Sequence, residues 1–293
     1  IRDSVASRGL GDVYKRQIYS LDYYLSKAEL FESMGADSIC IKDMAGLLAP
    51  YDAYNLVKGL KSKISVPLQL HSHYTSGMAS MSVLKAIEAG IDVVDTSLAP
   101  LALRTSQPAV EPLVVTLSGT PYDPKLDLEQ LLQLGDQLES ILPKYRHHLE
   151  SPKAAVIDAK VLSHQIPGGM ASNLLSQLRE ADAIDKLDEV LEEIPRTRKD
   201  LGYPPLVTPM SQMIGSQSVS NVLFGKYEMI SGQVKEYVYG MYGRPPSDID
   251  PEIAKTVLKD YKKGSPASDE RPANLLDPEL EKAKSEIADI TDN

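Results

Sequence analysis

ICIKDMAG at residues 39–46 and LHSHYTSG at residues 70–77 each run from an apolar, strand-like start into a polar end. The polar ends carry one lysine, Lys42, and two histidines, His71 and His73. Because alternate residues of a β-strand point to the same face, the two imidazoles should project together. A pair of imidazoles suits a divalent metal ion. The spacing alone is equally compatible with a strand that simply ends in polar residues.

Strand-like and helical patterns alternate around these two segments. After Ser20, a candidate helix N-cap, apolar residues recur at helical spacing, and the same spacing returns between the later β-prone runs. The expected strands span residues 38–42, 66–70 and 91–95. This order predicts parallel βαβ units, with polar residues after the strands, where both (β/α)8 barrels and doubly wound sheets bind ligands. The pattern does not distinguish the two folds, and three strands are too few to close a barrel.

Helical patterns dominate after about residue 120. Asp127 and Gln130 resemble a capping box ahead of a leucine stripe that runs to Pro143. Further helices are predicted at residues 171–181, 186–201, 213–224, 226–234 and 278–289. We therefore expect four parts: a foreign or disordered leader at 1–17, an α/β region at 18–120, a helical region at 121–263 and a linker or tail at 264–293.

Composition narrows the class of protein. The net charge is −10 over 293 residues, which argues against nucleic acid and against an anionic membrane surface as partners. No apolar run approaches the ~20 residues that span a bilayer, and residues 1–17 lack the apolar segment of a signal peptide. Cys40 is the only cysteine, so no internal disulfide can form. These features fit a globular protein of a reducing compartment such as the cytoplasm.

Five motifs occur in an order that resembles one family of enzymes. They are KDMAG (42–46), HSHYTSG (71–77), RTSQP (104–108), HQIPGG (164–169) and TPMSQ (208–212). Together they resemble the carboxyltransferase domain of biotin-dependent enzymes, which include oxaloacetate decarboxylase α subunits, pyruvate carboxylase B-type subunits and transcarboxylases. The resemblance covers about residues 18–275. It implies a (β/α)8 TIM barrel, of which 18–120 is the later part, followed by a mainly helical, funnel-like extension.

The resemblance also implies an activity and roles for particular residues. The activity is transfer of a carboxyl group between oxaloacetate and carrier-bound biotin, with release of pyruvate. A divalent metal, Zn, Mn or Co, would be held by His71, His73 and Lys42, the lysine being carbamylated. Thr105 would contact biotin and shuttle a proton between biotin and the pyruvate enolate. Asp43, judged from its position beside Lys42, could pair with a cation or accept a hydrogen bond from an imidazole, or else only cap its loop.

Partners follow from the same resemblance. No Lys-Met biotinylation pair stands in a suitable setting, so biotin should arrive on a separate carrier domain or subunit. We expect a homo-oligomer. If the protein belongs to a sodium-transporting decarboxylase, membrane-bound subunits should contact it through other regions. The family's first strands carry an Asp-Ala-x-Gln metal ligand and a substrate-binding arginine, and residues 1–17 do not replace them, so we expect this chain to be inactive alone.

Two other functions are compatible with the residues. One is a metal-dependent TIM-barrel lyase or aldolase that works without biotin, since such enzymes also use a His-x-His pair. Lys42 and Thr105 argue against it, because that chemistry needs neither a carbamate nor this threonine. The other is a non-catalytic scaffold that acts through its helical half. Metal binding would argue against the scaffold.

Overall fold

A computed structural model describes residues 4–6, 18–148, 157–159, 161–164, 166, 168–264, 267–276 and 278–288. The chain forms two compact units. The first unit comprises Ile1–Glu192 and Pro205–Gln212, and the second comprises Glu193–Pro204 and Met213–Asn293. These units reflect how tightly parts of the chain pack together. The domain boundary predicted near residue 120 is a different division and stays a prediction.

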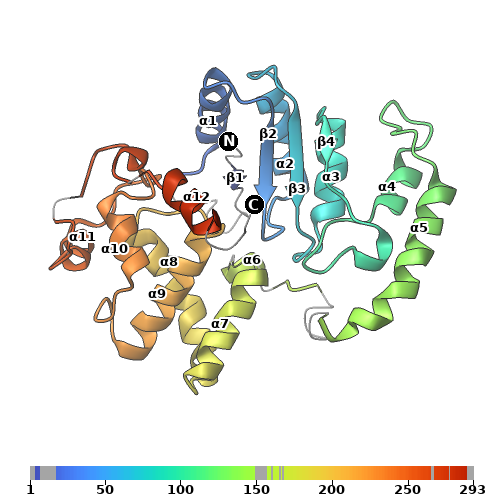
Figure 1. The fold of residues 1–293 in the computed structure, drawn as a ribbon. Helices are drawn as coiled ribbons and strands as arrows, with labels where there is room; N and C mark the ends of the chain where they lie inside the picture. Colours follow the sequence, from blue (N-terminus) through green and yellow to red (C-terminus); the bar gives the residue numbers. More distant parts are fainter. Residues whose placement is uncertain are drawn as a thin grey trace. The chain divides into compact units, whose positions relative to one another are not determined.

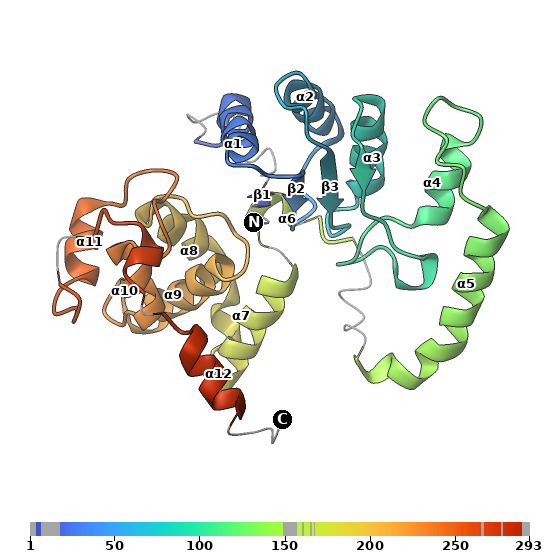
Figure 2. The ribbon, with the colours of Figure 1, turned by 45° about the horizontal axis from the view of Figure 1, so that its top comes forward.

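The first unit contains a four-stranded sheet with every neighbouring pair parallel. In spatial order the strands are β1 (Ser4–Ala6), β2 (Ile39–Asp43), β3 (Leu68–Ser72) and β4 (Val93–Val94). Three helices cover one face of the sheet (Figures 1 and 2): α1 (Leu21–Ser33), α2 (Pro50–Lys61) and α3 (Ala79–Glu88). The alternation of strands and helices predicted from the sequence is confirmed, and β4 is shorter than the run expected at 91–95.

Burial in β2 and β3 follows the two-residue period of a strand. Ile39, Ile41, Leu68 and Leu70 are buried and pack with the apolar stripe of α2 in one hydrophobic core. Each such side chain contributes about 1.5–3 kcal/mol by leaving water. The intervening residues of both strands are only half-buried, and they form the opposite face. Core packing on one face therefore directs Lys42 and His71 to the other.

The leader differs from the sequence-based expectation at three residues. Ser4–Ala6 forms a strand that pairs with β2, in register from Ser4 opposite Cys40 to Ala6 opposite Lys42. Three residues are too few to show a strand period in the sequence, but they can satisfy the backbone hydrogen bonds at the edge of β2. The rest of 1–17 lies outside the described residues.

Helices complete the first unit. Its remaining helices are α4 (Val110–Leu117), α5 (Leu128–Ile141), α6 (Val161–His164) and α7 (Gly168–Glu180), with 3₁₀ turns at Ala99–Leu101, Leu142–His148 and Ile184–Lys186. Asp127 caps α5 as predicted, because its carboxylate accepts from the N–H groups of Glu129 at 2.9 Å and Gln130 at 3.2 Å. The sequence pattern did not predict α4.

The second unit is helical in its described residues. It takes in α8 (Leu187–Asp200) from Glu193 onward and α9 (Met210–Phe224) from Met213 onward, then α10 (Gly232–Tyr239), α11 (Pro251–Val257), the 3₁₀ turn Pro272–Asn274 and α12 (Leu280–Ala288). Within the described residues, no helix is both long and apolar enough to cross a bilayer.

The helix predicted at residues 226–234 is wrong. A turn occupies its first half, where Gly225 and Tyr227 adopt positive φ angles of 104° and 56°. The Tyr227 N–H is bonded to the side chain of Asn221 at 3.0 Å, which holds the turn. Ser231 then caps α10 through the Val234 N–H at 3.3 Å. Asn221 is itself held by tertiary bonds to Glu193 and Thr197, so the turn that it fixes overrides the local apolar pattern.

Candidate metal centre

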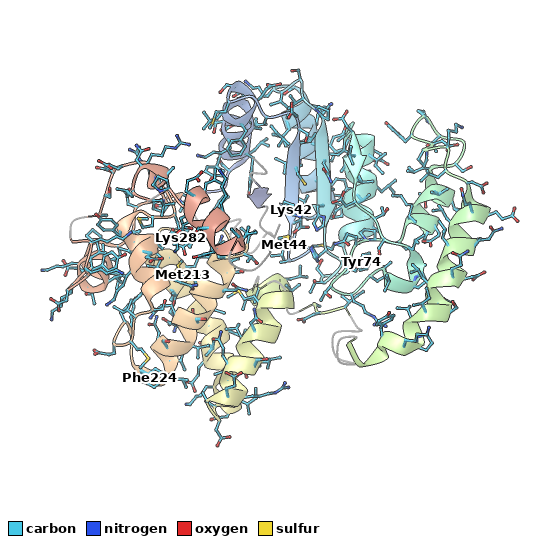
Figure 3. The ribbon with its side chains drawn as sticks, viewed as in Figure 1. Lys42, Met44, Tyr74, Met213, Phe224 and Lys282 are labelled. Atoms are coloured by element: carbon cyan, nitrogen blue, oxygen red, sulfur yellow. The ribbon has the colours of Figure 1, made fainter. Side chains whose placement is uncertain are left out.

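The predicted site residues lie at the carboxyl ends of the strands. Lys42 in β2 stands opposite His71 in β3, and Figure 3 shows Lys42 at this end of β2, with Met44 and Tyr74 in the loops that follow the strands. The His73 N–H donates to the Asp43 carbonyl at 3.0 Å, which extends the ladder between the two strands by one bond. Strand register therefore brings Lys42, His71 and His73 to one place.

The two imidazoles face each other through their Nε2 atoms, which lie 3.1 Å apart. His71 Nδ1 contacts Asp95 Oδ2 at 2.6 Å, and His73 Nδ1 contacts the backbone carbonyl of Thr105. A carbonyl or carboxylate oxygen can only accept, so both Nδ1 atoms must carry a proton. In a neutral imidazole this leaves a lone pair on Nε2. When both rings are neutral, two lone pairs converge on the space between them.

This arrangement fits a divalent metal ion. With metal–nitrogen bonds of ~2.0–2.1 Å and tetrahedral angles, two ligating nitrogens lie about 3.3 Å apart, close to the 3.1 Å found. Burial lowers the pKa of His73, and the charges of His71 and Lys42 lower it further, while the bond to the Thr105 carbonyl opposes them. The imidazole is thereby kept in the neutral form that binds metals.

Metal ligands beyond the two histidines must be residues other than His, Cys, Asp or Glu, or must come from outside the described residues. In the described part of the chain, no group of three or more His, Cys, Asp or Glu side chains could hold a metal. Lys42 is the residue of another kind that register places beside His71. A lysine amine is a ligand only after it loses its proton or is modified.

Asp43 holds the loop that follows β2. Its carboxylate is fully buried and accepts from the N–H groups of Leu47 at 2.8 Å and Leu48 at 3.0 Å, and from the Ser72 hydroxyl at 2.8 Å. The loop-cap alternative is therefore confirmed. The hydrogen bonds from the imidazoles go to other acceptors. His71 Nδ1 contacts Asp95, and His73 Nδ1 contacts the Thr105 carbonyl.

The segment around Thr105 is a tight loop with unusual backbone geometry. Leu103 and Arg104 have consecutive φ angles of 67° and 58°, in the left-handed region. The loop is closed by bonds of 2.8 Å from the Leu103 N–H to the Gln107 carbonyl and from the Ser106 N–H to the Leu103 carbonyl. It is tied to the chain after β3 by a bond of 2.8 Å from the Tyr74 N–H to the Ser106 carbonyl. Thr105 thus reaches the site through its carbonyl, and the shuttle role of its hydroxyl stays a prediction.

Sequence reasoning missed three polar residues of the site. Asp95 contacts His71, Gln69 donates to Asp95 Oδ1 at 2.6 Å, and Gln107 Nε2 lies 3.4 Å from His71 Nε2. A signal was present for two of them. Asp95 ends the strand-like run next in sequence after the histidines, and Gln107 belongs to the RTSQP motif. Gln69 lies in the middle of a strand, where no local pattern marks it.

Comparison with known proteins gives consistent matches along the chain. A family profile described as HMGL-like matches residues 16–138, and one described as a conserved carboxylase domain matches residues 161–293. The B-type subunit of pyruvate carboxylase from Methanocaldococcus jannaschii is 53% identical over 270 residues, which are 92% of this chain and 47% of that protein. The methylmalonyl-CoA carboxyltransferase 5S subunit of Propionibacterium freudenreichii is 41% identical over 93% of this chain and 54% of its own length.

Solved structures give the same result. The carboxyl transferase domain of Rhizobium etli pyruvate carboxylase superposes with a TM-score of 0.85 at 30% identity, over 97% of this chain and 49% of that one. The chain thus spans about half the length of the relatives it matches. Its parallel strands and helices form part of a TIM barrel followed by a helical extension, as predicted. By sequence and by fold, the chain is similar to the carboxyltransferase domains of pyruvate carboxylases and their relatives, and the HMGL-like and conserved carboxylase profiles match its two halves in turn.

Proposed function

We propose that the chain is the carboxyltransferase part of a biotin-dependent enzyme that moves a carboxyl group between oxaloacetate and biotin on a separate carrier, with pyruvate as the other product. The observation that carries the proposal is the pair of Nε2 atoms 3.1 Å apart, each on a ring whose Nδ1 is engaged by an acceptor. The similarity to the archaeal pyruvate carboxylase supports pyruvate as the keto acid that gains or loses the carboxyl group.

His71, His73 and carbamylated Lys42 would hold a divalent metal, Zn, Mn or Co. When bound, such an ion supplies a Lewis acid for the negative charge that develops on the substrate's keto oxygen. Carbamylation would convert the Lys42 amine, a donor, into an oxygen ligand. The half-buried position of Lys42 opposite His71 supports this assignment.

A residue of the chain would then move the proton that this transfer requires. As the bond between oxaloacetate C3 and its departing carboxyl breaks, the electron pair remains on the pyruvate enolate. The carboxyl carbon bonds to the biotin ureido nitrogen, and the proton of that nitrogen passes to C3. A hydroxyl can accept one proton while it donates another, so the Thr105 hydroxyl is proposed for this transfer. The carrier would dock from another domain or subunit.

The predictions about cellular location and assembly follow from the same proposed activity. We propose a cytoplasmic enzyme that forms homo-oligomers. Membrane-bound subunits and sodium transport apply only if the complete protein is a decarboxylase of the pumping kind. The relatives described above are named as pyruvate carboxylases and a carboxyltransferase, which favours a carboxylase or a transcarboxylase over a pump.

The test is made on the complete gene product, with His71→Ala, His73→Ala and, as a control, Asn55→Ala on the exposed face of α2. Metal content and carrier-dependent decarboxylation of oxaloacetate are measured together. Both histidine variants should lose bound metal and turnover, whereas the control should retain both. Stoichiometric metal in both histidine variants would disprove the site. Metal-dependent turnover that needs no biotin carrier would favour a lyase instead.

A further inference from the structure

We infer that Asp95, which follows β4, is a positioning residue of the proposed metal centre: it fixes the tautomer and the orientation of His71. The inference rests on the proposed function, because it concerns how a metal ligand is prepared. Asp95 would not contact the metal or the substrate. Its effect would pass entirely through the His71 ring.

The Asp95 carboxylate is held by two side chains, and a third bond holds the Asp95 backbone. Oδ2 accepts from His71 Nδ1 at 2.6 Å, and Oδ1 accepts from Gln69 Nε2 at 2.6 Å. The Asp95 N–H donates to the Leu70 carbonyl at 3.0 Å, which fixes the backbone on which the carboxylate stands. Gln69 and His71 lie two residues apart on one face of β3, so strand geometry presents both donors to the same carboxylate. A carboxylate held in this way has little freedom to rotate.

The contact is partly shielded from water. The side chains of His71 and Asp95 are 18% and 31% exposed. A hydrogen bond to a charged acceptor is shorter and stronger than one between neutral groups, and partial burial preserves that advantage. The 2.6 Å separation agrees with a charge-assisted bond.

The two histidines therefore have acceptors of different kinds. His71 donates to a charged carboxylate, whereas His73 donates to the neutral carbonyl of Thr105. A carboxylate acceptor raises the basicity of the opposite ring nitrogen and so strengthens its bond to a metal. The acceptor of His71 is a side chain, whereas the acceptor of His73 is part of the backbone. Only the effect of the first acceptor on metal affinity can therefore be tested by a substitution.

Asp95→Asn is an informative replacement because it keeps the shape and removes the charge. The new amide has an NH₂ group that can point at His71 Nδ1 and make that nitrogen an acceptor. The ring proton would then move to Nε2 and occupy the space where the lone pairs now converge. We expect metal affinity to fall by about 10–100-fold, the range for lost partners of metal ligands.

The chain offers a matched control and a milder variant. Asp92→Asn makes the same change three residues earlier, at a carboxylate that binds Lys61 Nζ and the Leu68 N–H instead of a histidine. Gln69→Leu leaves Asp95 intact but removes one of its donors. It should lower the affinity less than Asp95→Asn does, and it keeps the inference testable if Asp95→Asn does not fold.

Dissociation constants of Zn²⁺, Mn²⁺ and Co²⁺ are measured separately for the complete gene product and for each variant of it. The tautomer of His71 is read from ¹⁵N NMR of the metal-free protein, with the His71 signal assigned by its absence in His71→Ala. Weaker binding and a proton moved to Nε2 in Asp95→Asn, with Asp92→Asn unchanged in both, would support the inference. Equal affinity and an unchanged tautomer would overturn it and leave the metal site standing. Failure of the unaltered complete gene product to bind any of the three ions would overturn both.

Discussion

At the scale of single residues, Thr105 has two groups that matter for the site, its side-chain hydroxyl and its backbone carbonyl. Thr105 is predicted to act through its hydroxyl, yet the contact that the structure shows is made by its carbonyl, which accepts from His73. The same residue can therefore affect the centre in two independent ways. A substitution that removes the hydroxyl and keeps the backbone separates them.

We predict that Thr105→Val lowers carrier-dependent carboxyl transfer by about 10²–10⁴-fold, the usual cost of losing a positioned proton carrier. Metal affinity should be unchanged, because valine has the same shape and leaves the carbonyl in place. Thr105→Ser should restore much of the rate. Steady-state kinetics and metal titration of the complete gene product measure both effects.

A second hydroxyl provides the control for this prediction. Thr208 lies exposed in the TPMSQ motif, within Pro205–Gln212, which groups with the first unit. If Thr208→Val loses transfer and Thr105→Val does not, the shuttle is Thr208, and Thr105 serves only to hold His73.

At the scale of elements, the loop at residues 103–107 has an energetically unfavourable backbone conformation and contacts His73 of the histidine pair. Left-handed backbone in non-glycine residues costs about 1–2 kcal/mol each, and Leu103 and Arg104 are both left-handed. The contacts of Thr105 with His73 and of Ser106 with Tyr74 help to offset that cost. The order of the loop should therefore depend on how firmly the His73 ring is held.

We predict that removing the metal increases hydrogen exchange in residues 103–107 several-fold. Without an ion at Nε2, the His73 ring is free to turn away, and the Thr105 carbonyl loses its donor. Exchange is compared before and after chelation, with the amides of α2 as the internal control. Identical exchange of the loop in both states would show that its conformation does not depend on the metal.

At the scale of the whole molecule, the second unit has a buried polar network of its own. Asn221 accepts from Gln217 Nε2 at 2.9 Å and from the Tyr227 N–H at 3.0 Å, and it donates to Glu193 Oε1 at 3.1 Å and to Thr197 Oγ1 at 3.2 Å. Every one of these groups belongs to the second unit. Loss of the Asn221 side chain would remove these four bonds and leave the buried Tyr227 N–H without its acceptor, whereas Gln217 would keep the Met229 carbonyl and Thr197 would keep Glu193.

We predict that Asn221→Ala destabilises the second unit by about 1–3 kcal/mol, the cost of leaving the buried Tyr227 N–H unpaired. Ser218→Ala is the control, since that buried hydroxyl bonds only back to the Ile214 carbonyl of its own helix at 2.8 Å. Hydrogen exchange during denaturation should show earlier loss of protection in the second unit. Loss that begins in β2 and β3 instead would contradict the prediction.

The sequence by itself determined what depends on neighbours along the chain. The alternation that buries Ile39 and Ile41 and turns Lys42 to the opposite face, the shared face of His71 and His73, and the helix cap at Asp127 all follow from periods and caps that act within a few residues. These were enough to predict the α/β pattern, the parallel strands and the location of the candidate site.

Only the tertiary structure decided which distant residues meet. The pairing of β1 with β2, the contact of Asp95 with His71 and the turn held by Asn221 in place of a helix join residues that are remote in sequence or lack a local pattern. Strand register and side-chain packing set such contacts, and their energies depend on partners that local sequence does not specify. For this reason the histidine pair could be predicted from its spacing, whereas the contact of Asp95 with one of the two rings became visible only in the folded chain.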